Sequence, residues 1–192
     1  MPLKLNIGCG SNLIRGWVNL DPAPVPGTVR ASVLSLPVAD GSAECAVMLD
    51  VVEHLHPFKE APAALREVLR VLMPGGVLRV STPDLAKLAR AYVEGRVGAH
   101  GAASQPAWYP GAPAAIQFSA HVFGNHADTT PAGVYDGHQV LYDEEALTIL
   151  LREAGFREVL RQRPRESLSE AIRLDVRDRW PDVALIMEAR RF

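Results

Sequence analysis

The sequence predicts an α/β fold in which helices cover the faces of a largely parallel sheet. Strand-like apolar runs alternate with amphipathic helical runs through the middle of the chain, which is the order typical of such folds. The first apolar run ends in Gly8 and Gly10, and the second ends in Asp21. Glycines let a ligand approach the backbone at a strand end, and an acid on the next strand can accept both hydroxyls of a ribose. The start of the chain therefore predicts half of a nucleoside-binding crevice.

Apolar runs bounded by turn residues predict the strands of this sheet. They are expected at 3–7, 17–20, 29–33, 45–49, 77–81, 156–162 and 183–189.

Helices are expected between the middle strands. Apolar residues recur at helical spacing over 60–73, and Pro74-Gly75-Gly76 is expected to stop this helix and turn the chain. Pro83 is placed to end a strand and to help start a helix that runs to about residue 94.

Another helix is expected near the carboxyl end. Asp143 is the expected N-cap of an amphipathic helix over 143–154, which ends at Gly155. Glu144 and Glu145 fall in its first turn, where acids are favourable. The segment 165–180 is ambiguous, with a helix followed by a loop as one interpretation.

The N-terminal half has little room for helices. Gly10 and Asp21 are only 11 positions apart, whereas a parallel crossover usually takes a dozen residues or more. The prolines between 21 and 29 leave no helix there either. One face of the first three strands should therefore be thinly covered. A partner chain in a homodimer or the segment 96–137 could cover it, or short polar strands could tolerate water.

The segment 96–137 is predicted to be an inserted cover. It is rich in glycine, alanine and proline and shows no clear period, and a loop of this length is either functional or disordered. Its single aromatics favour an ordered cover, in which they contact substrate or form a core of their own. These aromatics are Trp108, Tyr109, Phe118, Phe123 and Tyr135.

Composition limits the class of protein. With 192 residues, 48% of them hydrophobic, the chain suits one domain over 1–192. A net charge of −2 with scattered basic residues argues against a nucleic-acid partner. Cys9 and Cys45 make no disulfide framework and are expected as buried fillers. There is no signal-like leader and no apolar run long enough for a membrane, so a cytoplasmic location is expected.

Further motifs accompany the glycines and Asp21. Val52-Glu53-His54-Leu55 follows the fourth strand, 70–78 leads into the fifth, and His138-Gln139-Val140-Leu141-Tyr142 precedes the last amphipathic helix. With this series the chain resembles class I S-adenosylmethionine-dependent methyltransferases, most closely the small bacterial branch called methyltransferase type 11.

The resemblance covers most of the chain. It implies a Rossmann-like seven-stranded, mostly parallel sheet with an antiparallel C-terminal strand. It implies S-adenosylmethionine as cofactor and methyl transfer to a small-molecule or glycan-like acceptor, directed to oxygen or nitrogen.

The resemblance also assigns cofactor contacts. Gly8 and Gly10 would face the methionine part of the cofactor, and Asp21 would accept from the ribose hydroxyls. Many relatives carry an aspartate at the adenine position, where this chain has Ser32; the N–H of Val33 could still serve an adenine nitrogen. The full set of expected contacts is Gly8, Cys9, Gly10, Asp21, Ser32, Val33, Leu49, Asp50 and Glu53.

Catalysis would depend mainly on alignment, since the sulfonium already provides a good leaving group. A hydroxyl acceptor also benefits from a base, and histidine suits this role. His54 is the first candidate because it follows the fourth strand, beside the methyl position. His121 and His138 are second candidates from the cover segment, and an amine acceptor would need no base.

Several residues have simpler explanations. The glycines could form an ordinary turn, Asp21 before Pro22 could be a turn residue, and Glu53-His54 could cap the strand and face solvent. His138 could pack structurally.

Other function classes stay open at this point. A metal at His121, His126 and Asp128 is disfavoured, since their spacing is not that of a helical metal site. A nicotinamide-dependent oxidoreductase is disfavoured because Leu13 stands where the third glycine would be. A catalytically inactive binding or regulatory module is the main alternative, motivated by the missing helices and by Ser32.

Overall fold

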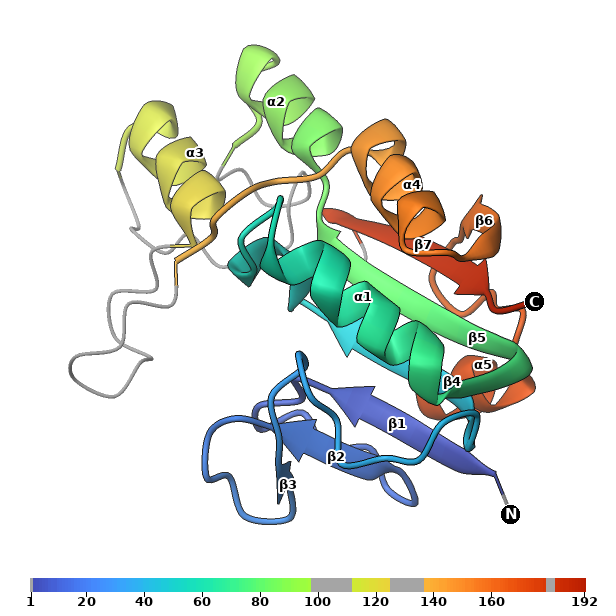
Figure 1. The fold of residues 1–192 in the computed structure, drawn as a ribbon. Helices are drawn as coiled ribbons and strands as arrows, with labels where there is room; N and C mark the ends of the chain where they lie inside the picture. Colours follow the sequence, from blue (N-terminus) through green and yellow to red (C-terminus); the bar gives the residue numbers. More distant parts are fainter. Residues whose placement is uncertain (1, 98–111, 125–136, 179–181) are drawn as a thin grey trace.

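The computed structural model describes residues 2–97, 112–124, 137–178 and 182–192. In these residues seven strands form one sheet: β1 (Leu3–Ile7), β2 (Val18–Asp21), β3 (Val29–Arg30), β4 (Ala43–Leu49), β5 (Leu72–Pro83), β6 (Arg157–Arg161) and β7 (Ala184–Arg190). Their order is β3-β2-β1-β4-β5-β7-β6 (Figure 1). β7 runs antiparallel to β5 and β6, and the other neighbouring pairs are parallel. The predicted sheet is confirmed.

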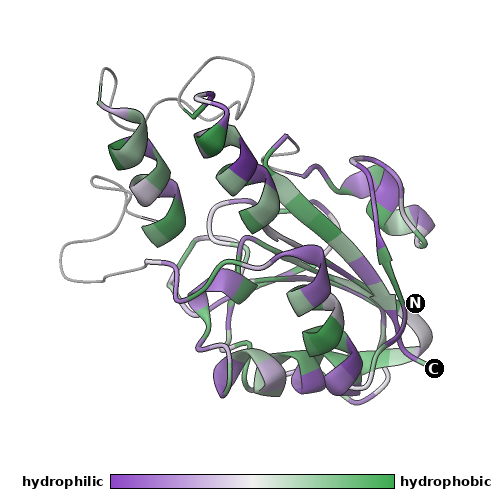
Figure 2. Ribbon diagram, turned by 90° about the horizontal axis from the view of Figure 1, so that it is seen from above, coloured by the Kyte–Doolittle hydropathy of each residue, from purple (hydrophilic) through white to green (hydrophobic). Residues whose placement is uncertain are grey.

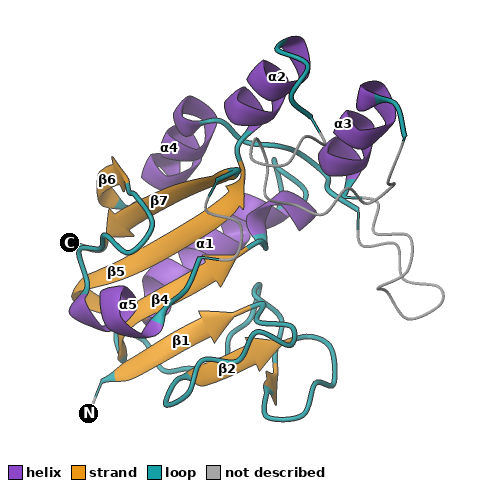
Figure 3. Cartoon of the chain, turned by 180° about the vertical axis from the view of Figure 1, so that it is seen from behind, coloured by secondary structure: helices purple, strands orange, loops and turns teal. Residues whose placement is uncertain are grey.

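Helices lie on both faces of this sheet. They are the 3-10 helix η1 (Val52–His54) and the α-helices α1 (Glu60–Val71), α2 (Leu85–Val93), α3 (Ala114–Phe123), α4 (Glu144–Glu153) and α5 (Glu170–Asp175). α1 and α4 pack on one face, and α5 lies on the opposite face against β4 (Figures 1 and 3). α2 and α3 are neighbours beyond the end of β5, where the ring centroids of Tyr92 and Phe118 are 4.8 Å apart. Figure 2 shows hydrophilic and hydrophobic residues alternating around these helices, as one-sided burial requires.

Side-chain caps set where two helices begin. The carboxylate of Asp84 accepts from the N–H groups of Ala86 and Lys87 at the start of α2. The carboxylate of Asp143 accepts from the N–H of Ala146 at 2.9 Å and caps α4, as the sequence predicted.

The expected end of the first helix is wrong. The helix stops at Val71, and Leu72 already has extended backbone (φ −68°, ψ 140°). Leu72 is fully buried and pairs with Ala43 of β4, so β5 begins before Pro74-Gly75-Gly76 and these residues lie within the strand. A Cβ on Gly76 would lie 2.8 Å from the carbonyl oxygen of Met73. The lack of a side chain at Gly76 therefore lets the start of β5 pass close to the backbone of Met73 and of β4.

The segment 96–137 contains a helix that the sequence did not predict. Among its described residues, α3 buries Gln117, Ala120 and His121 and ends at Gly124 (φ 62°). Its apolar residues have no clear helical period, which is why the pattern gave no signal. Trp108, Tyr109 and Tyr135 lie outside the described residues.

The N-terminal half has no helix between β1 and β4, a stretch that is described throughout. The outer face of β1 and β4 is covered by α5 and by the loop before β2. Ile14 and Trp17 pack in one buried cluster with Ile172 of α5. Asp175 then accepts from the ammonium of Lys4 and from the indole N–H of Trp17, both at 2.9 Å. Over β1 and β4, the face that the sequence predicted to be thinly covered is therefore covered by this chain's own C-terminal part, which was not among the covers expected from the sequence.

A buried arginine holds that C-terminal part on the sheet. Arg79 of β5 is 1% exposed, and its Nε and Nη2 donate to the Asp178 carboxylate at 2.9 and 2.8 Å. Its Nη1 donates to Glu188 of β7 at 2.7 Å and to the carbonyl of Glu166 at 2.8 Å. Glu188 also accepts from the N–H of Leu168 at 2.7 Å. The network thus joins β5, β7 and the segment that carries α5.

Arg79→Met is expected to lower the free energy of unfolding by about 3–5 kcal/mol, because it leaves two carboxylates buried without their partner. Urea denaturation followed by circular dichroism measures the change. Arg173→Ala is the matched control, since Arg173 is half exposed, lies 3.7 Å from Glu170, and should contribute less than about 1 kcal/mol. Similar losses in the two variants would contradict the assigned role of Arg79.

Candidate functional site

The strand order creates a topological switch point at the centre of the sheet, between β1 and β4. From β1 the chain moves outward to β2 and β3 and then returns to β4 on the other side of β1. Ligands of open α/β sheets bind outside the carboxyl ends of the strands at such a switch point. Gly8, Gly10, Asp21 and Asp50 all lie at this end, as the sequence predicted.

Gly8 allows a close approach between the turns that follow β1 and β4. It has φ of 66°, and a Cβ there would lie 2.6 Å from Cγ2 of Val51. The N–H groups of Gly8 and Cys9 both donate to the carbonyl of Leu20, at 2.8 and 3.1 Å. Gly10 has φ of 49° and has open space where its Cβ would be. The backbone after β1 is therefore fixed beside β2.

Asp21 is held in place by two backbone donors. Its Oδ2 accepts from the N–H of Gly10 at 2.7 Å and its Oδ1 accepts from the N–H of Ala23 at 2.8 Å. A carboxylate has about four acceptor sites, so these two bonds leave capacity for further donors. The structure thus brings together the glycine turn and the acid that the sequence paired by spacing alone.

The end of the third strand differs from the prediction. β3 stops at Arg30, so Ser32 and Val33 do not extend it as expected. Ser32 forms an isolated bridge with Ser35, and its hydroxyl accepts from the N–H of Leu34 at 3.2 Å. A tight turn therefore replaces the last part of the expected strand, and Ser32 lies exposed in it.

The turn after β4 is also constrained. Leu49 is buried, and Asp50 has φ of 57°, a left-handed conformation that is uncommon for a residue other than glycine. The N–H of Asp50 donates to the carbonyl of Ser81 at 2.9 Å, which ties the turn to β5. This sharp turn leads directly into η1.

Glu53, His54 and His138 lie together next to this turn, and we call them the Glu53–His54–His138 group. The carbonyl of Glu53 accepts from the N–H groups of Gln139 and Val140 at 2.7 and 3.3 Å. This link places the ring of His138 beside that of His54, with centroids 5.0 Å apart in an edge-to-face arrangement. Glu53 is fully buried, so the interpretation of Glu53 as a solvent-facing cap is wrong.

The C-terminal end of α3 packs against this group. The N–H of His138 donates to the carbonyl of Phe123 at 2.9 Å. A Cβ on Gly124 would lie 2.6 Å from Cδ2 of His138. His121 is buried on the same helix, whereas His126 and Asp128 lie outside the described residues.

Buried hydroxyl groups near these turns were missed in the sequence. Ser81, Thr82 and Tyr142 are at most 4% exposed, and their hydroxyls have no hydrogen-bond partner among the described residues. Burial, together with the charge of Glu53, raises the pKa of Tyr142 to about 12. Tyr142 therefore keeps its proton and offers a donor near Glu53. Single hydroxyl residues in apolar strands give no pattern that would have indicated this.

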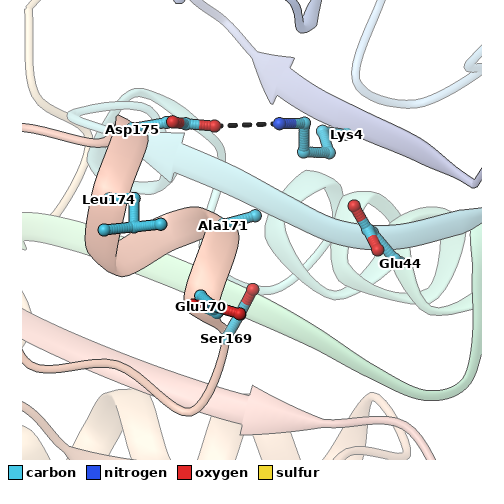
Figure 4. Close-up of a pocket in the computed structure, with 7 residues that line it drawn as sticks. All are labelled: Lys4, Glu44, Ser169, Glu170, Ala171, Leu174 and Asp175. Carbon is cyan, nitrogen blue, oxygen red and sulfur yellow. Dashed lines mark hydrogen bonds and ion pairs between the residues drawn. The ribbon is translucent and has the colours of Figure 1, made fainter.

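A cavity lies away from the strand ends that form the candidate site. It has a volume of about 370 Å³ and lies between α5 and the amino-terminal halves of β1 and β4, where Lys4 and Asp175 pair across it (Figure 4). Burial raises the pKa of Cys45 to about 12 and also raises that of Cys9, and both are free, buried thiols. Among the described helices, none has the length and apolar character that a bilayer crossing requires.

Comparison with known families gives one match, to a family model described as a methyltransferase domain, over residues 11–80. This range runs from the turn after β1 to the middle of β5 and contains Asp21, Asp50, Glu53 and His54. No curated protein matches the chain.

Solved structures match over nearly the whole chain. A SAM-dependent methyltransferase from Thermotoga maritima, described as a possible histamine N-methyltransferase, is 17% identical with a TM-score of 0.57, covering 100% of this chain and 83% of its own. A SAM-dependent methyltransferase from Archaeoglobus fulgidus is 15% identical with a TM-score of 0.55, covering 98% and 86%.

A third similar structure contains ligands. It is the Burkholderia thailandensis 1,6-didemethyltoxoflavin-N1-methyltransferase with 1,6-didemethyltoxoflavin and S-adenosylhomocysteine bound, 16% identical with a TM-score of 0.54, covering 99% of this chain and 71% of its own. At these identities the likeness establishes the fold that these proteins share.

Gly8→Ala is expected to lower the free energy of unfolding by at least about 1 kcal/mol more than Gly16→Ala, because only Gly8 faces a close side chain. Gly16 is a matched control, with φ of 79° and open space around its Cβ. Val51→Ala should recover part of the loss in the Gly8→Ala background, and urea denaturation of all four variants measures this coupling. Strictly additive effects of the two substitutions would show that the contact does not constrain Gly8.

Proposed function

We propose that this chain, which has a methyltransferase-domain sequence and the fold of class I S-adenosylmethionine-dependent methyltransferases, transfers the methyl group of S-adenosylmethionine to a small-molecule or glycan-like acceptor. The observation that carries the proposal is the Gly10–Asp21 hydrogen bond at the topological switch point. It holds the Asp21 carboxylate and the glycine turn side by side at the edge of the sheet where such folds bind nucleosides, and the carboxylate would accept from the ribose hydroxyls.

The cofactor would lie across the carboxyl ends of β1, β2 and β4. Gly8, Cys9 and Gly10 would present main chain to its methionine part, and the spare acceptor capacity of Asp21 would receive the ribose hydroxyls. Leu49 and Asp50 would line the methionine side. All six residues lie at the ends of strands or in the turns that follow them, where backbone hydrogen bonds or buried packing hold them in place. A site organised before binding loses little conformational entropy when the ligand arrives.

The adenine end would be held more weakly. The Ser32 hydroxyl accepts from a backbone N–H of its own turn, and no carboxylate stands at that position. This observation favours a second candidate function, a methyltransferase-like module that binds the nucleoside weakly or not at all and acts through a partner.

The acceptor would lie beside the Glu53–His54–His138 group, just beyond the methyl group. Transfer requires the acceptor atom in line with the methyl carbon and its sulfur, so the protein contributes mainly position. A hydroxyl acceptor must also lose its proton, and His54 and His138 are the groups nearest to do this work. An amine acceptor would need them only for orientation.

Asp21→Ala is expected to weaken S-adenosylhomocysteine binding about 10- to 100-fold, since hydrogen bonds to a charged group contribute about 1.5–3 kcal/mol. Isothermal titration calorimetry measures this, with Asp40→Ala as control because Asp40 is an exposed acid in a loop before β4. Unchanged affinity in Asp21→Ala would contradict the site assignment. No binding by the unmodified chain would favour the inactive module.

A further inference from the structure

The Glu53–His54–His138 group combines donors in a set that metals use. One ligand atom from each side chain, an imidazole nitrogen or a carboxylate oxygen, lies within 4.8 Å of the other two. Two histidines and one carboxylate form the three-ligand set of several catalytic zinc and non-haem iron sites, which keep positions open for a reacting molecule. Ligands of one ion at about 2.1 Å lie at most about 4.2 Å apart, so small side-chain rotations would close this group around an ion.

The backbone holds these three side chains in place from two distant segments. Glu53 and His54 are consecutive in η1, and the carbonyl of Glu53 accepts from Gln139 and Val140, which directly follow His138. The N–H of His138 is bound to the end of α3 as well. The positions of the donors therefore do not depend on an ion.

Burial also suits a reactive metal site. Glu53 is fully buried, whereas His54 and His138 are partly exposed. The anionic ligand is thus away from water, and the two imidazoles are the part of the group that a molecule could reach from solvent. A closed structural site would bury all of its ligands and would use four of them.

From this arrangement we propose that Glu53, His54 and His138 bind a divalent first-row transition-metal ion whose open positions take a hydroxyl oxygen of the methyl acceptor. The metal proposal stands on the geometry of the group, and its role in catalysis rests on the proposed methyl transfer. In this proposal the imidazoles do not remove the proton of the acceptor hydroxyl themselves; the charge of the metal ion they bind promotes its loss.

The step balances without any redox change. The metal-bound hydroxyl releases its proton to water, because the cation lowers the pKa of an oxygen bound to it. The resulting alkoxide oxygen bonds to the methyl carbon while the carbon–sulfur bond breaks. The electron pair of the broken carbon–sulfur bond stays on sulfur, and the sulfonium becomes a neutral thioether. Oxygen acceptors are therefore favoured over amines, whose nitrogen must keep its lone pair off the metal to react.

Cobalt(II) tests the site directly, because its visible absorption distinguishes nitrogen and oxygen ligands from thiolates. The full chain, with any purification tag removed and after treatment with a chelator, is titrated with CoCl₂ by calorimetry and absorption. We expect the unmodified chain to bind one equivalent of cobalt. Its cobalt affinity should fall by more than about 100-fold in each of Glu53→Gln, His54→Gln and His138→Gln. This is more than the loss caused by changing a residue that only contacts a metal ligand. His56→Gln is the matched control, since His56 lies two residues from His54 and outside the group.

The outcomes separate the two proposals. Absence of cobalt binding, equal loss in His56→Gln, or a thiolate spectrum from Cys9 would overturn the metal site. The main-chain links remain in every variant, and far-ultraviolet circular dichroism of each one reports whether it is folded. S-adenosylhomocysteine titration of the unmodified chain tests the proposed function separately. A chain that binds S-adenosylhomocysteine but no cobalt would contradict the metal site alone, and the reverse would contradict the proposed function alone. Catechol, a chelating diol, tests whether the ion has open coordination positions. A cobalt spectrum that does not change when catechol is added would contradict that part of the proposal.

Discussion

The buried charge of Arg79 constrains much of this fold. A guanidinium out of water requires its carboxylates, because a lone buried charge costs several kcal/mol. Asp178 and Glu188 supply them, and Asp178 belongs to the segment that also carries α5. α5 is therefore held on the face of the sheet where the shortened N-terminal crossovers leave no helix. With that face closed, β1 and β4 stay buried on both sides, and their carboxyl ends form the crevice.

Local signals in the sequence were sufficient for much of the fold. The strands β1 and β4 and the cap Asp143 follow from apolar period and capping chemistry, which depend on residues a few positions apart. The pairing of Gly10 with Asp21 was also predictable, because neighbouring parallel strands end at the same edge. Each of these features needs only the nearest elements of structure.

The remainder depends on contacts between distant residues. Leu72 leaves its helix because β4 offers it a buried partner, which overrides the helical period. The histidines 54 and 138 were both candidates in the sequence, yet only the carbonyl of Glu53 brings them together. The packing of Glu53 and of α3 likewise depends on distant contacts, made by Phe123 and by residues 138–140. Single-sequence patterns carry no information on such pairings.

The position of α5 has a consequence for the order in which the chain folds. Lys4 and Trp17 lie 171 and 158 residues from Asp175, their shared partner. During synthesis the first strands therefore emerge long before the helix that shields them. Contacts of such separation slow folding and leave apolar surface open to association in the meantime. The nascent N-terminal half therefore keeps apolar surface exposed until the residues of α5 have been made.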